Sequence, residues 1–335
     1  MKKKITFFVR KPFKTGNYSV ETYYKELEKN LSKKFDIRIF EVPFYSKGFF
    51  QRILNCIICV FNQGDINHVI GDIHYVTLFL DRKKTILTIL DCVALHNNNG
   101  LKKNILKYLW FTLPIKKSAV VTTISKATLD DLKDNLQINF DATVIYFFTN
   151  NNYYAFNPKS IHNKNTYNLL QIGTAPNKNI DRLIEALVDI NCKITFIGSL
   201  TLKQKDFLSK NNIDYEIISN GISNTQVQEE YIKSDIVTYV STLEGFGMPI
   251  IEANKIGRPI VTSNISSMPE IGGNSALYVN PYSVEDIKKG IKRLCNDISL
   301  RKKLIHNGIN NYKRFNSKII SNQYANLYEN LIKHG

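Results

Sequence analysis

The feature that most constrains the fold is a regular alternation of short apolar strands with helix-length amphipathic segments. Strands joined by helices run parallel, and a parallel sheet needs helices on both faces. The first half therefore predicts a parallel sheet covered on both sides. Its expected strands are Lys4–Val9, Asp36–Val42, Ile66–Ile70, Thr85–Leu90, Ala119–Ile124 and Thr143–Tyr146. Its expected helices are Tyr18–Leu31, Phe49–Phe61, Leu101–Phe111 and Lys126–Leu136.

The alternation is interrupted by a polar, Asn-rich stretch and then restarts. This stretch, Asn150–Asn168, is typical of a linker between domains. The expected strands beyond it are Tyr167–Ile172, Lys193–Ile197, Tyr215–Ile218, Asp235–Val240 and Pro259–Thr262, with helices at Asn179–Asp189, Thr201–Asn211, Thr225–Lys233 and Ser317–Lys333. A chain of 335 residues is long enough for two α/β domains that each have a core.

The composition argues against several classes of protein. No apolar run approaches the length that spans a bilayer, and Met-Lys-Lys-Lys leads straight into a strand, so we expect no signal peptide. The five cysteines are scattered, and the pair Cys56 and Cys59 has no second pair to complete a zinc site. We expect reduced thiols and a cytoplasmic protein. A peripheral position on the inner face of the plasma membrane is compatible with this expectation.

The net charge of +16 favours a polyanionic partner. Nucleic acid, anionic lipid and phosphate-bearing substrates all fit that charge. We find no nucleic-acid-binding module and no basic stripe interleaved with aromatic residues. The sequence therefore predicts a membrane surface or a pyrophosphate group, and no nucleic acid.

Nine residues from Glu244 to Glu252 read Glu-Gly-Phe-Gly-Met-Pro-Ile-Ile-Glu and follow the buried strand Asp235–Val240. Pro249 is suited to the first turn of a helix, and we expect Glu252 on the same turn. A strand, a glycine turn and a helix leave free backbone amides for an anionic ligand. A carboxylate beside such a site suits a ligand that also offers hydroxyls, as a nucleotide-sugar does. The alternative is a plain turn with a glutamate that favours the helix N-terminus.

The nine-residue pattern resembles the signature of family-four retaining glycosyltransferases of the GT-B fold, in which two glutamates frame Gly-Phe-Gly-x-Pro. The resemblance implies two Rossmann-like parallel-sheet domains that face a central cleft. The acceptor-side domain would be 1–155 and the nucleotide-sugar-binding domain 156–315. The C-terminal segment, 316–335, would form a helix that crosses back to pack on the N-terminal domain.

The resemblance also implies roles for the motif residues. Glu244 would hold sugar hydroxyls and favour positive charge at the anomeric carbon, and Glu252 would accept hydrogen bonds from the ribose diol. The donor pocket would be framed by Ser241, Gly245, Phe246, Gly247 and Met248. Glu270, in Ser-Ser-Met-Pro-Glu-Ile-Gly, would support the acceptor side, although a plain loop carboxylate explains it nearly as well.

Gly173-Thr174-Ala175-Pro176-Asn177-Lys178-Asn179 ends one predicted strand and opens the next helix. Lys178 is a cation that can neutralise a leaving diphosphate, although a solvated loop lysine is the alternative. Related enzymes often place an arginine where this chain has Thr174. The phosphate contacts would then rest on Gly173, Thr174, Lys178 and backbone amides, unless Arg10 or Lys14 reaches the site.

Three places in the first half are expected on the acceptor side. Gly16 lies in a segment that resembles a closing loop, and a simple helix cap explains it almost as well. Asp72 and His74 follow a predicted strand. Related enzymes often carry His-Asp after the next strand, where this chain has Leu90 and Asp91. We assign Asp91 and His74 to catalysis, with a structural histidine as the alternative for His74.

The predicted function is retaining transfer of a sugar from a UDP- or GDP-sugar to a saccharide acceptor, expected to be lipid-linked, in bacterial O-antigen or capsule synthesis. We expect no metal and no other cofactor, because the sequence has no Asp-x-Asp motif of the other large glycosyltransferase fold. Transfer to a soluble acceptor is the alternative within the fold. A non-catalytic subunit that binds lipid-linked saccharide or a partner enzyme is the alternative outside it.

The segment Phe49–Phe61 places six apolar residues on one helical face: Phe50, Ile53, Leu54, Ile57, Ile58 and Phe61. Such a stripe usually packs on its own sheet, and this is the preferred interpretation. The alternative is an interfacial helix that docks, with the basic first domain, on anionic lipid.

Overall fold

A computed structural model describes residues 1–12, 19–148, 157, 162–219 and 221–334. The chain divides into two compact units. The first consists of Met1–Phe148 together with Ser317–Gly335, and the second of Thr149–Asn316. Most of the predicted linker, and Gly16 and Lys14, lie outside the described residues.

The first unit is built on a six-stranded parallel sheet in the order β2-β1-β3-β4-β5-β6. Its strands are β1 Lys4–Val9, β2 Asp36–Glu41, β3 Ile66–Ile70, β4 Thr85–Ile89, β5 Val120–Thr123 and β6 Thr143–Val144. Its helices are α1 Ser19–Leu31, α2 Phe49–Val60, α3 Val93–His96, α4 Gly100–Leu106, α5 Leu113–Lys116, α6 Lys126–Leu136 and α14 Ser317–His334. Strands β3 and β4 are buried along their whole length, and β4 accordingly reads as an unbroken run of apolar and β-branched residues.

The second unit has its own six-stranded parallel sheet, in the order β12-β11-β10-β7-β8-β9. Its strands are β7 Tyr167–Ile172, β8 Cys192–Ile197, β9 Asp214–Ile218, β10 Ile236–Tyr239, β11 Ile260–Ser263 and β12 Leu277–Val279. Its helices are α7 Ile180–Ala186, α8 Leu202–Lys210, α9 Asn224–Lys233, α10 Met248–Ile256, α11 Met268–Gly272, α12 Val284–Asn296 and α13 Ile298–Tyr312. The two parallel sheets confirm the predicted fold class. Strand β12 and helices α11 to α13 were not predicted.

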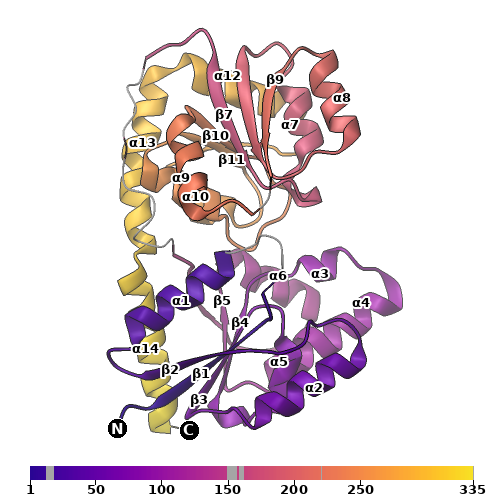
Figure 1. Ribbon diagram of the computed structural model, residues 1–335, viewed down its shortest axis with the longest axis vertical. Helices are drawn as coiled ribbons and strands as arrows, with labels where there is room; N and C mark the ends of the chain where they lie inside the picture. Colours follow the sequence, from indigo (N-terminus) through magenta and orange to yellow (C-terminus); the bar gives the residue numbers. More distant parts are fainter. Residues whose placement is uncertain (13–18, 149–156, 158–161, 220, 335) are drawn as a thin grey trace. The chain divides into compact units, whose positions relative to one another are not determined.

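The last helix, α14, belongs to the first unit although it follows the second in sequence (Figure 1). It packs against α1, and its side chains Tyr324 and Tyr328 are fully buried. The Tyr328 hydroxyl lies 2.7 Å from Nδ1 of His68 on β3. The predicted return of the C-terminal helix to the N-terminal domain is therefore correct.

The segment predicted as one helix, Leu101–Phe111, is α-helical only to Leu106 and continues as a π-helical turn, Lys107–Thr112. Pro114 supplies the physical reason, because it has no N–H for the carbonyl of Trp110 four residues earlier. That carbonyl accepts a hydrogen bond from Nδ1 of His74 instead, at 2.9 Å. A wider turn of this kind is common near functional sites.

The apolar stripe on α2 does not pack on its own sheet, so the preferred interpretation of it is wrong. Phe50, Leu54, Ile57 and Phe61 are exposed. The buried side of α2 is formed by Asn55, Cys56 and Cys59. Asn55 donates to the carbonyl of Phe44 and to the Tyr75 hydroxyl, both at 2.9 Å, so polar contacts orient this helix.

No helix among the described residues is both long and apolar enough to cross a bilayer.

Candidate functional site

The turn after β10 has the form expected from the sequence. Gly247 has φ +113°, a conformation that favours glycine, and directly precedes α10, whose first turn contains Pro249. One detail of the prediction is wrong. Because α10 begins at Met248, Glu252 lies on its second turn rather than its first. Its Oε2 accepts a hydrogen bond from the buried Tyr231 hydroxyl at 2.7 Å.

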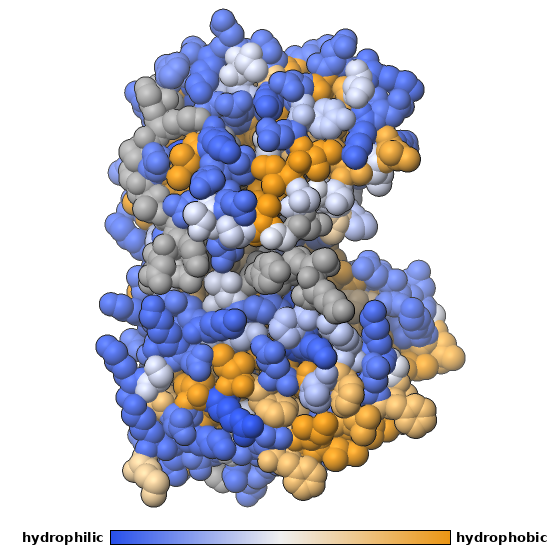
Figure 2. All heavy atoms as spheres, viewed as in Figure 1, coloured by the Kyte–Doolittle hydropathy of each residue, from blue (hydrophilic) through white to orange (hydrophobic). Residues whose placement is uncertain are grey.

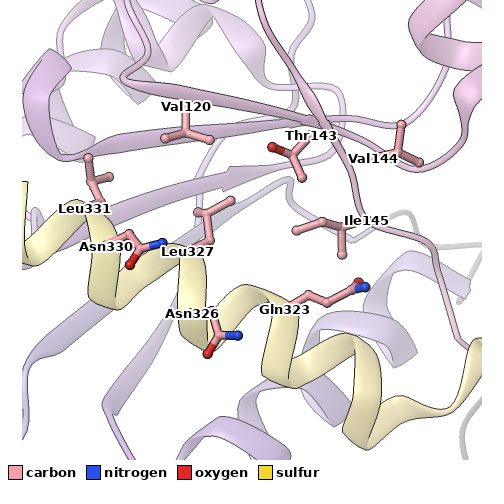
Figure 3. Close-up of a pocket in the computed structure, with 9 residues that line it drawn as sticks. All are labelled: Val120, Thr143, Val144, Ile145, Gln323, Asn326, Leu327, Asn330 and Leu331. Carbon is pink, nitrogen blue, oxygen red and sulfur yellow. The ribbon is translucent and has the colours of Figure 1, made fainter.

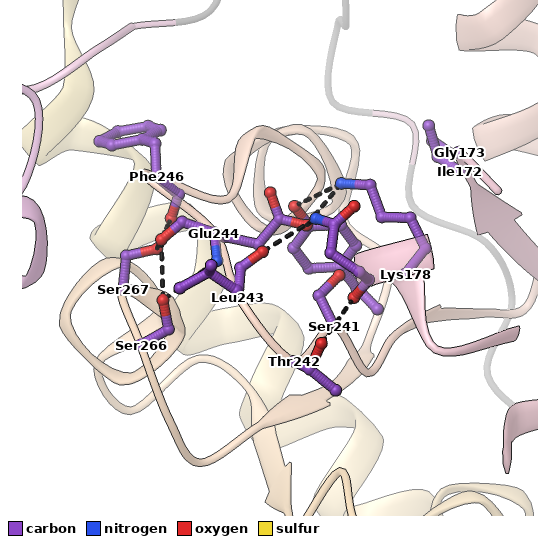
Figure 4. A network of polar contacts seen from close by, with 12 residues as sticks. Ile172, Gly173, Lys178, Ser241, Thr242, Leu243, Glu244, Phe246, Ser266 and Ser267 are labelled. Atoms are coloured by element: carbon purple, nitrogen blue, oxygen red, sulfur yellow. Dashed lines mark hydrogen bonds and ion pairs between the residues drawn. The ribbon is translucent and has the colours of Figure 1, made fainter. Parts of the chain in front are cut away.

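An ion pair forms the centre of the site. Nζ of Lys178, in the turn after β7, lies 2.5 Å from Oε1 of Glu244, in the turn after β10 (Figure 4). Both side chains are largely shielded from solvent. Lys178 also donates to the Tyr239 hydroxyl at 3.2 Å. Burial, and secondarily the charge of Glu244, raises the pKa of Tyr239 well above its usual range, so the phenol stays neutral. The sheet thus brings together a cation and a carboxylate that are far apart in sequence.

Asn177 is a site residue to which the sequence analysis gave no role. Its Nδ2 donates to the carbonyl of Leu243 at 2.9 Å and to Oε1 of Glu244 at 3.0 Å. Its own carbonyl accepts from the backbone N–H of Thr242 at 2.8 Å. Asn177 therefore joins the two turns and orients the Glu244 carboxylate. The only signal in the sequence was its position next to Lys178.

Two serines hold the backbone of the motif from the other side. Ser266 Oγ accepts from the backbone N–H of Glu244 at 3.1 Å and donates to its carbonyl at 2.8 Å. Ser267 Oγ donates to the carbonyl of Phe246 at 2.6 Å. Ser266 has φ +58°, which is rare for a residue other than glycine. Strained backbone of this kind is found where the surrounding structure fixes a functional site.

Gly173 and Thr174 precede Lys178 in the same turn, and their contacts are with other parts of the protein. Gly173 has φ +78°, and a Cβ at this position would lie 3.1 Å from Cε of Lys178. The lysine stem therefore crosses the space that a side chain would fill. Thr174 Oγ1 accepts from the backbone N–H of Ser199 at 2.9 Å, so it joins β7 to the loop after β8.

The remaining motif residues lie around this centre. The Phe246 ring makes an edge contact with Phe315, with the centroids 5.6 Å apart, and points away from Lys178 (Figure 4). Ser241 is buried directly after β10, and its carbonyl accepts from Ser263 Oγ at 2.6 Å. Gly245 lies in the turn and Met248 opens α10. Glu270 lies on α11, in the same unit as the motif.

In the first unit, three of the residues predicted on the acceptor side line one cavity of about 580 Å³. Asp72, His74 and Asp91 line it after the ends of β3 and β4, together with Arg10. Arg10 is paired with Glu21 at 3.3 Å and lies 3.9 Å from Asp72, so its charge is engaged within the first unit.

His74 is a buried side chain of this cavity. Its Nδ1 donates to the carbonyl of Trp110. Burial lowers the pKa of His74, so the imidazole is neutral near pH 7. This geometry suits a structural histidine, and it also suits a neutral base that lines the cavity.

A second cavity of the first unit, of about 550 Å³, lies between the β5–β6 edge and α14 (Figure 3). Among the residues that the structure describes, none of those predicted for the site lines it. Its walls combine aliphatic side chains with the amides of Gln323, Asn326 and Asn330.

The five cysteines are buried free thiols. Burial raises the pKa of Cys56 and of Cys59 to about 12. No three His, Cys, Asp or Glu side chains cluster as metal ligands within the part of the chain that the structure describes.

Residues 155–311 match the family model of the glycosyl transferases group 1. An uncharacterized glycosyltransferase of Methanocaldococcus jannaschii is 28% identical over 256 residues, which are 74% of this chain and 70% of that protein. The O-antigen chain mannosyltransferase B of Escherichia coli is 35% identical over 99 residues, which are 30% of this chain and only 26% of that protein. The crystal structure of HepE from Anabaena, with UDP-glucose, superposes with a TM-score of 0.77 at 15% identity, covering 98% of this chain and 100% of HepE. The structural likeness establishes the GT-B fold, and the family match covers the unit that carries the ion pair.

Proposed function

We propose that this chain, whose residues 155–311 match the family model of the glycosyl transferases group 1, moves a sugar, with retention of anomeric configuration, from a UDP- or GDP-sugar to a lipid-linked saccharide acceptor. The product would be a bacterial surface polysaccharide of the O-antigen or capsule type, assembled at the inner face of the plasma membrane. The name of the Escherichia coli relative supports the O-antigen setting, and the UDP-glucose bound by HepE supports a nucleotide-sugar donor.

The observation that carries this proposal is the ion pair between Lys178 and Glu244 at the ends of β7 and β10. Ligands of parallel α/β sheets bind at the carboxyl ends of the strands. A lysine there can face a diphosphate, while a carboxylate beside it can accept hydrogen bonds from sugar hydroxyls. The Gly245–Gly247 turn leads into α10, whose N-terminal amides suit an anion.

In the proposed reaction, the bond between the anomeric carbon and the diphosphate oxygen breaks as the acceptor oxygen bonds to the same face of the sugar. The acceptor proton passes to the leaving phosphate. Lys178 neutralises the charge that grows on the diphosphate, and Glu244 favours the positive charge at the anomeric carbon. Asn177 and Ser266 hold Glu244 in place, and Glu252 accepts hydrogen bonds from the ribose diol.

The first test identifies the donor and then removes the charge of Glu244. A thermal-shift screen with UDP, GDP, UDP-glucose and GDP-mannose selects the nucleotide, because a ligand of the native state raises the melting temperature. Transfer of radiolabelled sugar is then measured into the organic phase of a bacterial lipid extract and into the aqueous phase. We expect Glu244→Gln to lower transfer on the order of 10²-fold or more and to leave the fold intact.

Glu185→Gln is the matched control, because Glu185 is exposed on α7 of the same unit and lies outside the site. Its transfer should equal that of the wild type. Near wild-type transfer by Glu244→Gln would contradict the assignment and favour a non-catalytic binding subunit. Labelled saccharide that is separated from the donor and from free sugar and is found only in the aqueous phase would show a soluble acceptor instead.

Metal independence is part of the same proposal. Because Lys178 and the amides of α10 are assigned the charge of the leaving group, we expect transfer to persist in EDTA. The measurement is the transfer rate after dialysis against EDTA, with and without added Mg²⁺ or Mn²⁺. A rate that disappears and returns with either ion would mean that a cation does the work assigned to Lys178.

A further inference from the structure

The first unit exposes a cluster of large apolar side chains, which we term the apolar face. Phe50 and Phe61 are 80% and 82% exposed, and Leu101 is 76% exposed. Figure 2 shows apolar atoms gathered where Figure 1 places α2 and α4. The apolar face consists of Phe49, Phe50, Leu54, Ile57 and Phe61 along α2, and Leu101, Ile105, Tyr108 and Leu109 along α4 and the following π-helical turn.

The α2 part of this face is a continuous stripe. Phe50, Leu54, Ile57 and Phe61 follow the spacing of one helical face over about 16 Å. Moving phenylalanine and leucine side chains out of water is favourable, so a surface of this composition gains free energy when it is covered. Scattered exposed apolar residues are ordinary on protein surfaces, but a stripe of this kind marks a surface that another apolar phase covers.

The two segments that form the apolar face contain no carboxylate. Residues 42–64 and 92–129 include no Asp or Glu. They carry the basic residues Lys47, Arg52, Lys102, Lys103, Lys107, Lys116, Lys117 and Lys126. The two segments that form the face therefore contribute apolar side chains and positive charge but no negative charge, which suits a partner that is both apolar and anionic.

This combination distinguishes between the candidate partners. A second copy of the chain, docked symmetrically, would bring the same lysines toward one another, and like charges repel. A bilayer that contains anionic lipid offers acyl chains to the phenylalanines and phosphates to the lysines. Helix α2, with 12 residues, is too short to cross a bilayer and suits a position in the interface.

We propose that the apolar face docks the first unit on an anionic membrane, with α2 lying in the interface. The proposal rests on the proposed function only for the reason the protein visits a membrane, namely a lipid-linked acceptor. The surface itself is argued from its exposed side chains and its charge. Binding to vesicles requires neither donor nor acceptor, so it can fail or succeed independently of transfer.

Co-sedimentation with vesicles tests the proposal. The full chain is mixed with vesicles of phosphatidylcholine alone or with about one third phosphatidylglycerol, and the pelleted fraction is measured. We expect binding to the anionic vesicles, several-fold weaker binding to the neutral ones, and release as salt is raised. Lys102→Glu with Lys103→Glu, and separately Leu101→Ser, should each lower the pelleted fraction several-fold.

The second unit offers matched controls. Lys302 and Lys303 form an exposed lysine pair on α13, so Lys302→Glu with Lys303→Glu makes the same change in net charge away from the face. Leu202 opens α8 and is 85% exposed, so Leu202→Ser removes a similar apolar side chain. Both controls should bind vesicles as the wild type does.

Three outcomes would overturn the proposal. They are equal recovery in the supernatant with both vesicle types, equal losses in the controls and in the variants of the face, and a concentration-dependent dimer that Phe50→Ser with Phe61→Ser abolishes. The last, seen by analytical ultracentrifugation, would assign the face to a second copy. Variants of the face that no longer bind vesicles but still transfer sugar to a detergent-dispersed acceptor would show that only docking was lost.

Discussion

At the residue scale, Gly173 determines where Lys178 can lie. Its φ of +78° strains any other residue, and an added Cβ would lie 3.1 Å from Cε of the lysine. We expect Gly173→Ala to displace Lys178 from Glu244 and to raise the Kd for the donor nucleotide about tenfold, because a charged contact to phosphate is lost. Titration calorimetry with the nucleotide found in the thermal-shift screen measures the change.

Gly221→Ala separates this effect from backbone strain. Gly221 also has positive φ, +97°, in the same unit, but nothing lies within 4 Å of a Cβ built there. Both variants should lose a similar part of the free energy of unfolding, of about 1 kcal/mol. Nucleotide affinity should fall in Gly173→Ala alone. Equal loss of affinity in both variants would mean that Gly173 acts only through stability.

At the element scale, buried His68 ties α14 to the sheet of the first unit. Its Nδ1 lies 2.7 Å from the Tyr328 hydroxyl of α14, and its Nε2 lies 2.7 Å from Thr88 Oγ1 of β4. Burial lowers the pKa of His68 to about 3, whereas an unfolded histidine titrates near 6.5. The unfolded chain therefore binds a proton between pH 6.5 and 3 that the native chain does not.

The free energy of unfolding should consequently fall as the pH is lowered through this window. The contribution of His68 is up to about 1.4 kcal/mol per pH unit. Urea unfolding of the full chain at several pH values from 7 to 4 measures the slope. His68→Gln should flatten it, while His306→Gln, at an exposed position of α13, should not. A slope that is the same in all three proteins would contradict the assignment.

The predicted helices and strands differ in how well the sequence indicated them. Strand β4 was found within one residue, because a buried parallel strand is a continuous run of apolar and β-branched residues. Strand β3 was found with its observed bounds although it contains Asn67 and His68. Helices α12 and α13 were missed although α12 is strongly amphipathic and both begin at capping residues, Ser283 and Asp297. The π-helical turn was missed although Pro114 signals a break in the helix, and the hydrogen bond that the Trp110 carbonyl accepts from His74 is visible only in the tertiary structure.

At the scale of the whole molecule, each unit has its own buried core and its own set of site residues. The second holds the ion pair, and the first holds the cavity with Asp72, His74 and Asp91. The positive charge is also placed unevenly within the first unit, because residues 92–129 contain lysines and no carboxylate. This run is visible in the sequence, but its position beside the exposed apolar side chains of α2 and α4 appears only once the helices are placed (Figure 1).

By itself, the sequence determined the two parallel sheets, the glycine turn before α10 and the identity of the charged residues near it. These follow from local information, since periodicity and turn residues act within a few positions of the chain. The tertiary structure alone decided that Lys178 meets Glu244, that Asn177 and Ser266 orient the motif, and that the α2 stripe is exposed. The physical reason is that amphipathicity shows which face of a helix is apolar but not what covers it. Contacts between distant turns depend on the order of strands in the sheet, which places β7 beside β10.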